Sequence, residues 1–320
     1  MNEFELIKKY FSKLSKKSKS SLNLNDDVFF DKSSNIVVSI DTYNVRKHFF
    51  NFKNPELVIK KVIRSSISDL ICKGVKPKYY FLSGSGNRKA FTKTNLSKIS
   101  KSLKEEQKKY NIILGGGDTV FSNKLSFTVT SKGFAKKIVY RNKSNIVDDI
   151  YVTGNLGDSF VGLLVLKNKI KINKKLSNYF INQYYKPEIN HSLGSYLNKF
   201  ATSSIDLSDW LISDLEKLTN NQNNSYQLFL NKIPISNNLK LVISSKNLLK
   251  KNFVSKGDDY QILFTANADH RNLIGNISSF KKLKITRIGK ILNSSIKSSI
   301  VDRNNRQIKI NDQGYFHRFD

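Results

Sequence analysis

Cysteine is almost missing from this chain of 320 residues, in which Cys72 is the single example. One cysteine excludes an internal disulfide and any metal site built from several cysteines. Because Cys72 stands in an apolar run with helical spacing, we expect a buried core thiol. The scarcity of cysteine fits the reducing cytoplasm, which is the location we predict.

Long apolar runs are missing as well. No stretch approaches the eighteen or more apolar residues that a transmembrane helix needs, so we expect no membrane partner. The first ten residues, Met1 to Tyr10, include Glu3 and Glu5 and lack the apolar segment of a signal peptide. Both observations agree with a cytoplasmic protein.

Acidic residues are few, since 25 Asp and Glu stand against 55 Lys and Arg and give a net charge of +30. Nucleic-acid-binding proteins often carry such a charge. Here the lysines are spread along the whole chain, as in a biased composition rather than a binding surface. We therefore expect no nucleic-acid partner, although the positive field would attract a phosphorylated small substrate.

Strands and helices mix in both halves of the chain, which predicts an α/β (α+β) fold of two domains. Periodicity predicts strands at 36–40, 79–83, 111–115, 124–134, 149–154, 226–230, 260–265 and 284–291. It predicts helices from Pro55 to Gly74, at 95–109, after Gly157, at 173–185 and 190–200, and along the stripe of Leu207, Leu211, Leu215 and Leu218. A polar stretch at 142–149 indicates a boundary between domains at 1–145 and 146–320.

The scarce carboxylates gather in short motifs. These are NDD (25–27) with Asp27, SIDT (39–42) with Asp41, SDL (68–70) with Asp69 and GGGD (115–118) with Asp118. Asp41 and Asp118 each follow an apolar strand, so we expect both at a sheet edge where α/β proteins bind ligands. Such oxygen ligands suit Mg²⁺, and no cluster of His and Cys indicates zinc. Each motif alone is also explained by a turn or a helix cap.

The GGGD motif brings together three of only 15 glycines. Glycine lets backbone N–H groups approach phosphate oxygens closely. The motif lacks the Lys and the Ser or Thr of a P-loop and is not GxGxxG. It therefore indicates a phosphate contact without identifying a nucleotide-binding fold.

The segment SSIDLSDWLISDLE (203–216) concentrates four carboxylates and holds the single tryptophan, Trp210. We expect Ser208 and Asp209 at the start of a helix, where free N–H groups and the helix dipole attract anions. Alternatively, Asp206 and Asp209 share metal ions that hold phosphates against this helix end. A plain N-cap would explain an isolated SxD motif as well.

Together and in order, these motifs resemble the thiamine-monophosphate kinase family, which is related to aminoimidazole ribonucleotide synthetase and selenophosphate synthetase. The resemblance covers nearly the whole chain and includes KHF (47–49), VTGNLGDSFVGL (152–163), IDLSDWLISDL (205–215), GDDY (257–260) and GY (314–315). It implies two α/β domains, with N-terminal domains that pair into a barrel in a homodimer. It also implies that ATP phosphorylates thiamine monophosphate to thiamine diphosphate with several Mg²⁺ ions.

The resemblance also implies a set of site residues. The positions similar to magnesium ligands are Asp27, Ser39, Asp41, Asp69, Asp118, Asp206 and Asp209. Those similar to ATP contacts are Gly117, Asp118, Arg141 and Ser208. Those similar to thiamine-monophosphate contacts are His48, Asp258 and Tyr315.

Two departures from the family pattern concern the phosphate site. Trp210 stands where the family has glycine, and Lys256 replaces the first glycine of a GGED motif, in which Asp258 shortens the Glu. We expect the Trp210 ring to pack outward, because burial of an indole is favourable by roughly 2–3 kcal/mol.

Two alternatives remain open. One is another ATP-dependent synthetase of the superfamily; selenophosphate synthesis is disfavoured because Cys72 has a helical context. The other is a catalytically weakened, basic RNA-binding protein on the same scaffold, which the accumulated departures allow.

Overall fold

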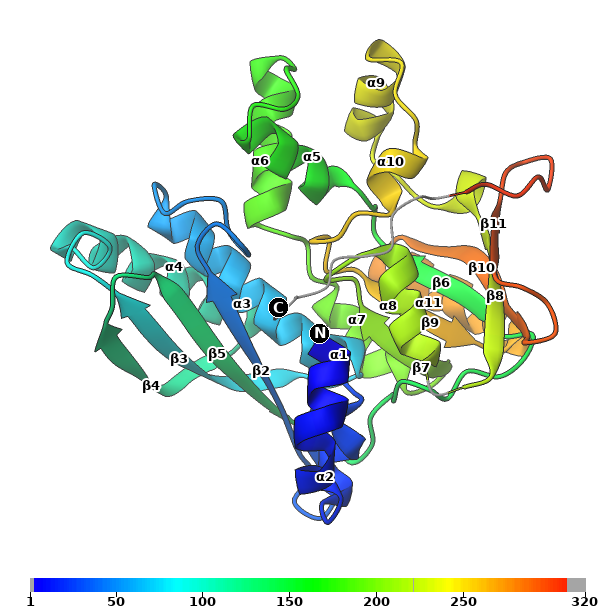
Figure 1. The fold of residues 1–320 in the computed structure, drawn as a ribbon, viewed down its shortest axis with the longest axis horizontal. Coiled ribbons are helices and arrows are strands. Elements are labelled where there is room, and N and C mark those ends of the chain that lie inside the picture. Colours follow the sequence, from blue (N-terminus) through cyan, green and yellow to red (C-terminus); the bar gives the residue numbers. More distant parts are fainter. Residues whose placement is uncertain (1–2, 221, 310–320) are drawn as a thin grey trace.

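The computed structural model describes residues 3–220 and 222–309, and it contains two β-sheets, one in each half of the chain (Figure 1). Short helical segments come first: α1 (Glu3–Leu6), η1 (Ile7–Phe11), α2 (Ser12–Ser15) and η2 (Lys19–Leu24). The first sheet has the order β1-β2-β5-β3-β4. Its strands are β1 (Phe29–Asp31), β2 (Ile36–Asn44), β3 (Pro77–Gly86), β4 (Ile113–Phe121) and β5 (Ser126–Phe134).

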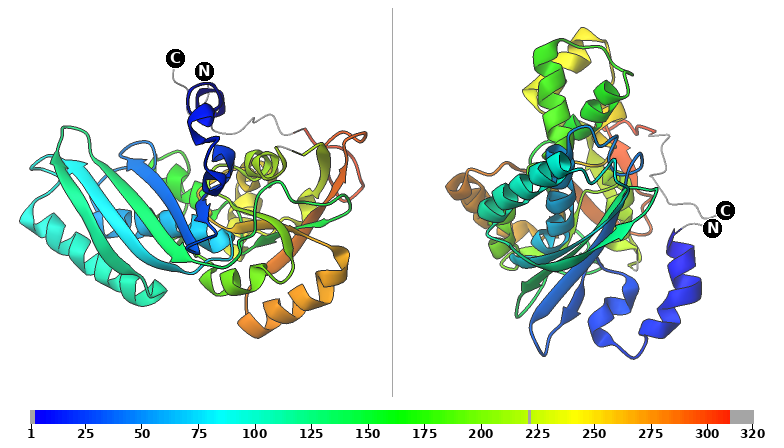
Figure 2. Two further views of the ribbon diagram at one scale, coloured as in Figure 1. Left: turned by 90° about the horizontal axis from the view of Figure 1, so that it is seen from below. Right: turned by 90° about the vertical axis from the view of Figure 1, so that its left-hand side faces the viewer.

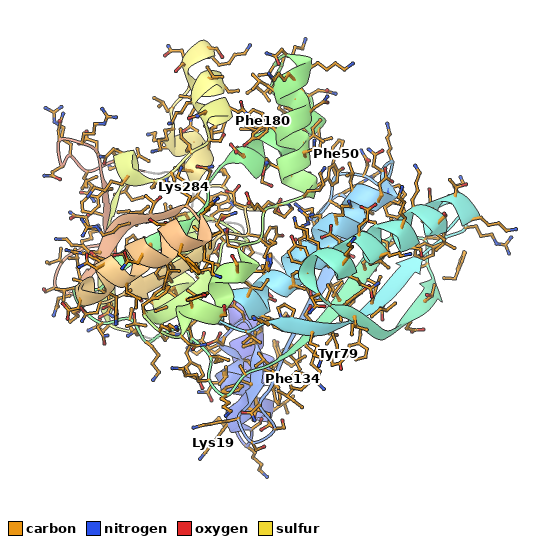
Figure 3. All side chains as sticks on the ribbon, turned by 180° about the vertical axis from the view of Figure 1, so that it is seen from behind. Lys19, Phe50, Tyr79, Phe134, Phe180 and Lys284 are labelled. Carbon is orange, nitrogen blue, oxygen red and sulfur yellow. The ribbon has the colours of Figure 1, made fainter. Side chains whose placement is uncertain are left out.

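Two long helices, α3 (Pro55–Cys72) and α4 (Lys93–Tyr110), cover one face of this sheet (Figure 2). The opposite face and the edge strand β4 leave large apolar side chains exposed, namely Ile40, Phe81, Ile113, Leu114, Val120, Phe121 and Phe134. Tyr79 and Phe134, labelled in Figure 3, pack edge to face with ring centroids 6.4 Å apart. A soluble face of this kind is typical of a surface that another chain covers.

Helix α3 forms as its sequence predicts. Pro55 occupies the first turn, where a missing N–H costs nothing. Its apolar side chains recur at helical spacing and are almost all fully buried. The chain leaves the helix at Gly74, whose φ of +80° lies in the left-handed region that favours glycine.

The second sheet has the order β11-β8-β10-β6-β9-β7. Its strands are β6 (Asp149–Thr153), β7 (Ala201–Asp206), β8 (Asn224–Phe229), β9 (Ile262–Ala266), β10 (Ile285–Asn293) and β11 (Ser299–Val301). The helical segments of this half are α5 (Asp158–Leu166), α6 (Lys174–Tyr185), α7 (His191–Leu197), α8 (Leu211–Thr219), η3 (Leu230–Lys232), α9 (Asn237–Ser245), α10 (Lys251–Val254), η4 (Ala268–His270) and α11 (Arg271–Lys281). Helices α5, α6, α9 and α10 project together on one side of the molecule (Figure 1) and share a small apolar core.

Helix α3 lies between the two halves. It packs against β2 and β5 of the first sheet and against α6, α7 and β7 of the second half. The largest apolar core accordingly contains residues from both halves, from Tyr43 to Ile277. The domain boundary at residue 145 stays a prediction, because this packing makes the halves continuous.

The α/β (α+β) prediction is confirmed, with three local corrections. Asp41 and Asp118 do not follow their strands but lie inside them, because β2 continues to Asn44 and β4 to Phe121. Strand β7 was missed and takes the end of the helix expected at 190–200. Its sequence ATSSID is polar because Ser204 is buried against α3, where its hydroxyl donates to the backbone oxygen of Cys72.

Across the described ranges, no helix is both long and apolar enough to cross a membrane. Cys72 is buried, as expected, and burial raises the pKa of its thiol well above the usual value.

Gly162 on α5 provides a test of the packing between α5 and α6. A Cβ at this position would lie 2.2 Å from the backbone oxygen of Phe180, which Figure 3 labels on α6. We expect Gly162→Ala to lower the free energy of unfolding by about 1–3 kcal/mol. Gly275→Ala on α11 is the matched control, because nothing lies within 4 Å of its Cβ position. Urea denaturation should show the control more stable by roughly 0.5–1 kcal/mol; equal shifts in both variants would contradict the contact.

Candidate active site

A cavity of about 510 Å³ contains most of the site residues expected from the sequence. Its wall is formed by β2 and the turn after it, α3, α5, the turn between β7 and α8, and the loop before β9. Both halves of the chain therefore contribute to it. The expected residues on the wall are Asp41, His48, Asp69, Asp206, Ser208, Asp209 and Asp258.

Three carboxylates from three elements meet at one end of the cavity. Asp41 comes from β2, Asp69 from α3 and Asp206 from the last position of β7. The carboxyl groups of Asp41 and Asp69 share a hydrogen bond, which places a proton between them. The Tyr43 hydroxyl donates to Asp41 Oδ2 at 2.9 Å, and the Ser68 hydroxyl donates to Asp206 Oδ2 at 2.5 Å.

Burial and mutual repulsion disfavour the charged forms of these acids. Burial, followed by the charge of Asp206, raises the pKa of Asp41 to about 6, against the hydrogen bond from Tyr43. Burial and the charge of Asp41 raise the pKa of Asp69 well above its usual value. Burial also raises the pKa of Asp206, although Ser68, Arg141 and Lys73 oppose the shift. Clustered oxygen ligands that resist ionisation when bare fit a hard cation such as Mg²⁺.

Asp27 lies beside this cluster but is held by basic side chains. Oxygen atoms of Asp27 and Asp206 lie within 4.8 Å of each other. The Lys73 ammonium binds Asp27 at 2.6 Å and Asp26 at 2.8 Å, and the Arg141 guanidinium also pairs with Asp27. Lys73 is fully buried, and sequence reasoning missed it because a lysine after a helix is usually exposed.

Asp209 and Ser208 lie before the helix rather than in its first turn. Helix α8 begins at Leu211, and Trp210 is its N-cap residue with an extended backbone. The Asp209 N–H donates to Asp214 Oδ2 at 3.0 Å, and the Lys217 ammonium pairs with both carboxylates. This N–H therefore does not face the cavity, and the expected backbone anion site at the helix start is not formed by Asp209.

The structure also corrects the expected position of Trp210. Its ring lines the cavity instead of packing outward. The ammonium of Lys256 lies 3.8 Å from the centroid of this ring. The outward position fails because the ring gains this contact with a cation, which an apolar packing estimate leaves out.

Asp258 is anchored from α3 through a buried lysine. The Lys61 ammonium lies 2.9 Å from Asp258 Oδ1 and 3.8 Å from the ring centroid of Tyr184. Asp258 has a φ of +70°, and its N–H donates to the Ser208 oxygen at 2.9 Å. Lys61 is 1% exposed, and as an isolated basic residue in a helix it gave no signal in the sequence.

Four expected residues lie away from the cavity wall. Ser39 is buried on β2, and its hydroxyl donates to the Ser66 oxygen at 3.4 Å. Gly117 and Asp118 belong to the exposed edge strand β4, which β5 and β3 separate from β2. Asp118 pairs with Ser83, in register with Thr42 and so on the opposite face of the sheet from Asp41. Arg141 touches the acid cluster from behind, through Asp27.

Tyr315 falls outside the described residues, so its predicted contact with thiamine monophosphate stays a prediction.

Comparisons with known proteins agree with this geometry. Residues 25–135 match the family model of the AIR synthase related protein, N-terminal domain. The thiamine-monophosphate kinase of Buchnera aphidicola subsp. Acyrthosiphon pisum (strain APS) is 34% identical over 325 residues, which cover 98% of this chain and 98% of that protein. The chain belongs to the thiamine-monophosphate kinase family. The resemblance inferred from the motifs is thereby confirmed.

Other members and a solved structure extend this result. The thiamine-monophosphate kinase of Haemophilus influenzae (strain ATCC 51907 / DSM 11121 / KW20 / Rd) is 33% identical over 306 residues, 91% of this chain and 89% of that protein. The structure of AaThiL complexed with AMPPCP and TMP has a TM-score of 0.84 at 24% identity and covers 99% of this chain and 97% of that one. It shows the same fold, as expected for this kinase family.

The acid cluster makes a prediction about pH and magnesium. The raised pKa of Asp41 means that its contribution to stability is present below its unfolded pKa near 4 and is lost as pH rises through about 6. Magnesium binds the ionised form, so we expect MgCl₂ to raise Tm more at about pH 7.5 than at about pH 5. Differential scanning fluorimetry, with NaCl at matched ionic strength as the control, measures the difference. Equal rises at both pH values would argue against metal binding by these acids.

Proposed function

We propose that this chain transfers the γ-phosphoryl group of ATP to thiamine monophosphate and forms thiamine diphosphate. The observation that carries the proposal is the cavity, in which the carboxylates of Asp41, Asp69 and Asp206 share one wall with basic side chains. Those basic side chains are Arg46, Lys47, Lys167 and Lys256. Relatives that match the whole chain are named thiamine-monophosphate kinases, and a protein of the same fold was solved with AMPPCP and TMP.

The reaction needs no side-chain base. An oxygen of the acceptor phosphate attacks the γ-phosphorus, the new P–O bond replaces the bond to the β–γ bridging oxygen, and ADP leaves with that electron pair. The second pKa of a phosphate monoester is about 6, so the attacking oxygen is already ionised near neutral pH. The main obstacle is repulsion between two polyanions, which the site must offset.

Asp41, Asp69 and Asp206 are the proposed magnesium ligands within the cavity, with Asp209 on the same wall. Asp27 and Ser39 lie beside this group and complete the proposed set. Bound Mg²⁺ supplies positive charge that neutralises phosphate oxygens. Carboxylates facing phosphates without such a charge would repel them, so the acids support a metal-dependent kinase.

The remaining site residues are proposed to position the two substrates. Ser208 on the cavity wall and Arg141 behind it are proposed to contact ATP. His48 and Asp258 are proposed to contact thiamine monophosphate, together with Tyr315. The ion pair with Lys61 would keep the Asp258 carboxylate in a defined position.

We also propose a homodimer formed through the N-terminal sheet. Its uncovered face and edge strand β4 expose a set of apolar side chains that a second copy of the chain would bury. Within one chain, Asp118 and Gly117 are separated from Asp41 by two strands. If Asp118 serves a metal and ATP as the resemblance implies, it has to do so from the partner chain.

The other proposals concern location and partners. We propose that the kinase works in the cytoplasm and does not bind nucleic acid. Its acids are concentrated in the cavity, whereas its lysines are spread along the chain. An RNA-binding protein on this scaffold is not favoured, because full-length relatives carry the kinase name.

Asp41→Asn should abolish formation of thiamine diphosphate from thiamine monophosphate and MgATP. Asparagine keeps the shape of the side chain but removes the charge, so we expect kcat to fall by at least roughly 100-fold. Asp269→Asn, at an exposed position on η4, is the matched control and should keep wild-type turnover. Chromatographic assay of the product gives the rates. Product formed from free thiamine but not from the monophosphate would refute the substrate assignment.

Complementation tests the proposed role of Asp118 in the dimer. Asp41→Asn and Asp118→Asn should each be inactive as homodimers. In a mixed dimer, one site would carry both substitutions and the other neither, so mixing the two variants should restore up to about half of the wild-type turnover. Sedimentation velocity should show a dimer at micromolar protein. A monomer, or no activity after verified subunit exchange, would remove this proposal.

A further inference from the structure

Lys256 and Trp210 form a contact pair on the wall of the cavity. The ammonium of Lys256 lies 3.8 Å from the Trp210 ring centroid and 5.8 Å from that of Phe160 on α5. All three residues line the cavity. Two positions that depart separately from the glycines of the family motifs are thus joined in space.

The pair is not needed to hold its two loops together. The N–H of Asp258 donates to the Ser208 oxygen, and the N–H of Tyr260 donates to the Leu207 oxygen, both at 2.9 Å. Gly257 packs so closely that a Cβ there would lie 1.6 Å from the Asp209 oxygen. Backbone contacts alone therefore fix the spacing of the loops, and the side-chain pair is available for another role.

The position of the ammonium indicates that role. Lys256 is two residues from Asp258, which is proposed for the acceptor, and its loop contacts Ser208, which is proposed for ATP. Its charge therefore lies between the positions assigned to the two phosphate-bearing substrates. A lysine ammonium carries three donors and suits phosphate oxygens. Contact with an aromatic face restricts the flexible side chain without neutralising it, which lowers the entropy lost on binding.

We propose that Lys256, positioned by Trp210, binds phosphate oxygens of the nucleotide where the two substrates meet. The assignment rests on the proposed kinase function and adds a phosphate-binding residue to it. Positive charge at the transferred phosphoryl group stabilises its transition state, as other cationic side chains do in phosphoryl transfer. Trp210 acts as a positioning residue, because its ring reaches the phosphates only through the ammonium.

The test compares Lys256→Met, Lys256→Arg, Trp210→Phe and Trp210→Leu with the wild type in the full chain. Calorimetry measures the affinity for AMPPCP with Mg²⁺, without turnover. A charged hydrogen bond corresponds to a loss of about 10- to 100-fold in affinity for Lys256→Met. Arginine and phenylalanine should stay within a few-fold of the wild type, and Trp210→Leu should lose several-fold. Lys246→Met, which removes an exposed charge after α9, is the control for net charge and should bind as the wild type does.

Fluorescence gives a second readout, because Trp210 is the only tryptophan in the chain. Binding of AMPPCP should change its emission in the wild type, as the ammonium turns toward phosphate, and should change it little in Lys256→Met. Both Lys256→Met and Trp210→Leu should melt near the wild-type Tm, because backbone bonds hold the loops.

Three results would overturn the assignment. One is unchanged AMPPCP affinity in Lys256→Met, with or without a lower Tm. The second is a loss of affinity for thiamine monophosphate in Trp210→Leu while Lys256→Met keeps both substrates, which would mean that the ring receives the cationic acceptor. The third is no AMPPCP binding by the wild type, which would remove the proposed function as well. A wild type that binds AMPPCP through Lys256 but forms no thiamine diphosphate would refute only the proposed function.

Discussion

Repulsion among the carboxylates of Asp41, Asp69 and Asp206 is the constraint on which the site depends. Each comes from a different element, and burial alone already disfavours their ionisation. The folded chain tolerates the group through a shared proton between two of them and donated hydrogen bonds from Tyr43 and Ser68. An arrangement that is costly when bare becomes favourable with a bound cation, which makes the metal a part of the folding energetics as well as of the proposed chemistry.

Helix α3 creates this arrangement because its buried polar side chains each find a partner on another element. The pairs are Lys61 with Asp258, Arg64 with Glu106, Ser68 with Asp206 and, directly after the helix, Lys73 with Asp26 and Asp27. Removal of one partner from such a pair leaves an uncompensated buried charge, which is strongly unfavourable. The relative position of the two sheets is therefore linked to the geometry of the cavity.

The cavity combines inherited and individual features. The acids follow the family motifs, whereas Trp210 and Lys256 depart from them and contact each other. Two glycines would have left this wall open to backbone contacts. A paired indole and ammonium instead present a side-chain charge, so the same phosphate chemistry can be served by a different kind of donor.

Much of this protein was determined by local sequence. The periodicity of α3, the glycine after it and the apolar strands require no long-range information, because helix and strand patterns depend on near neighbours. The ordered Asp motifs identified the family for the same reason. Tertiary structure alone decided which acids meet: it placed Asp41, Asp69 and Asp206 together and Asp118 on the opposite face of a distant strand. It also decided the partners of Lys61 and Lys73 and the inward position of the Trp210 ring, because each depends on a charge more than 40 residues away in the chain or on another loop. Such contacts arise from packing between elements, and no local pattern encodes them.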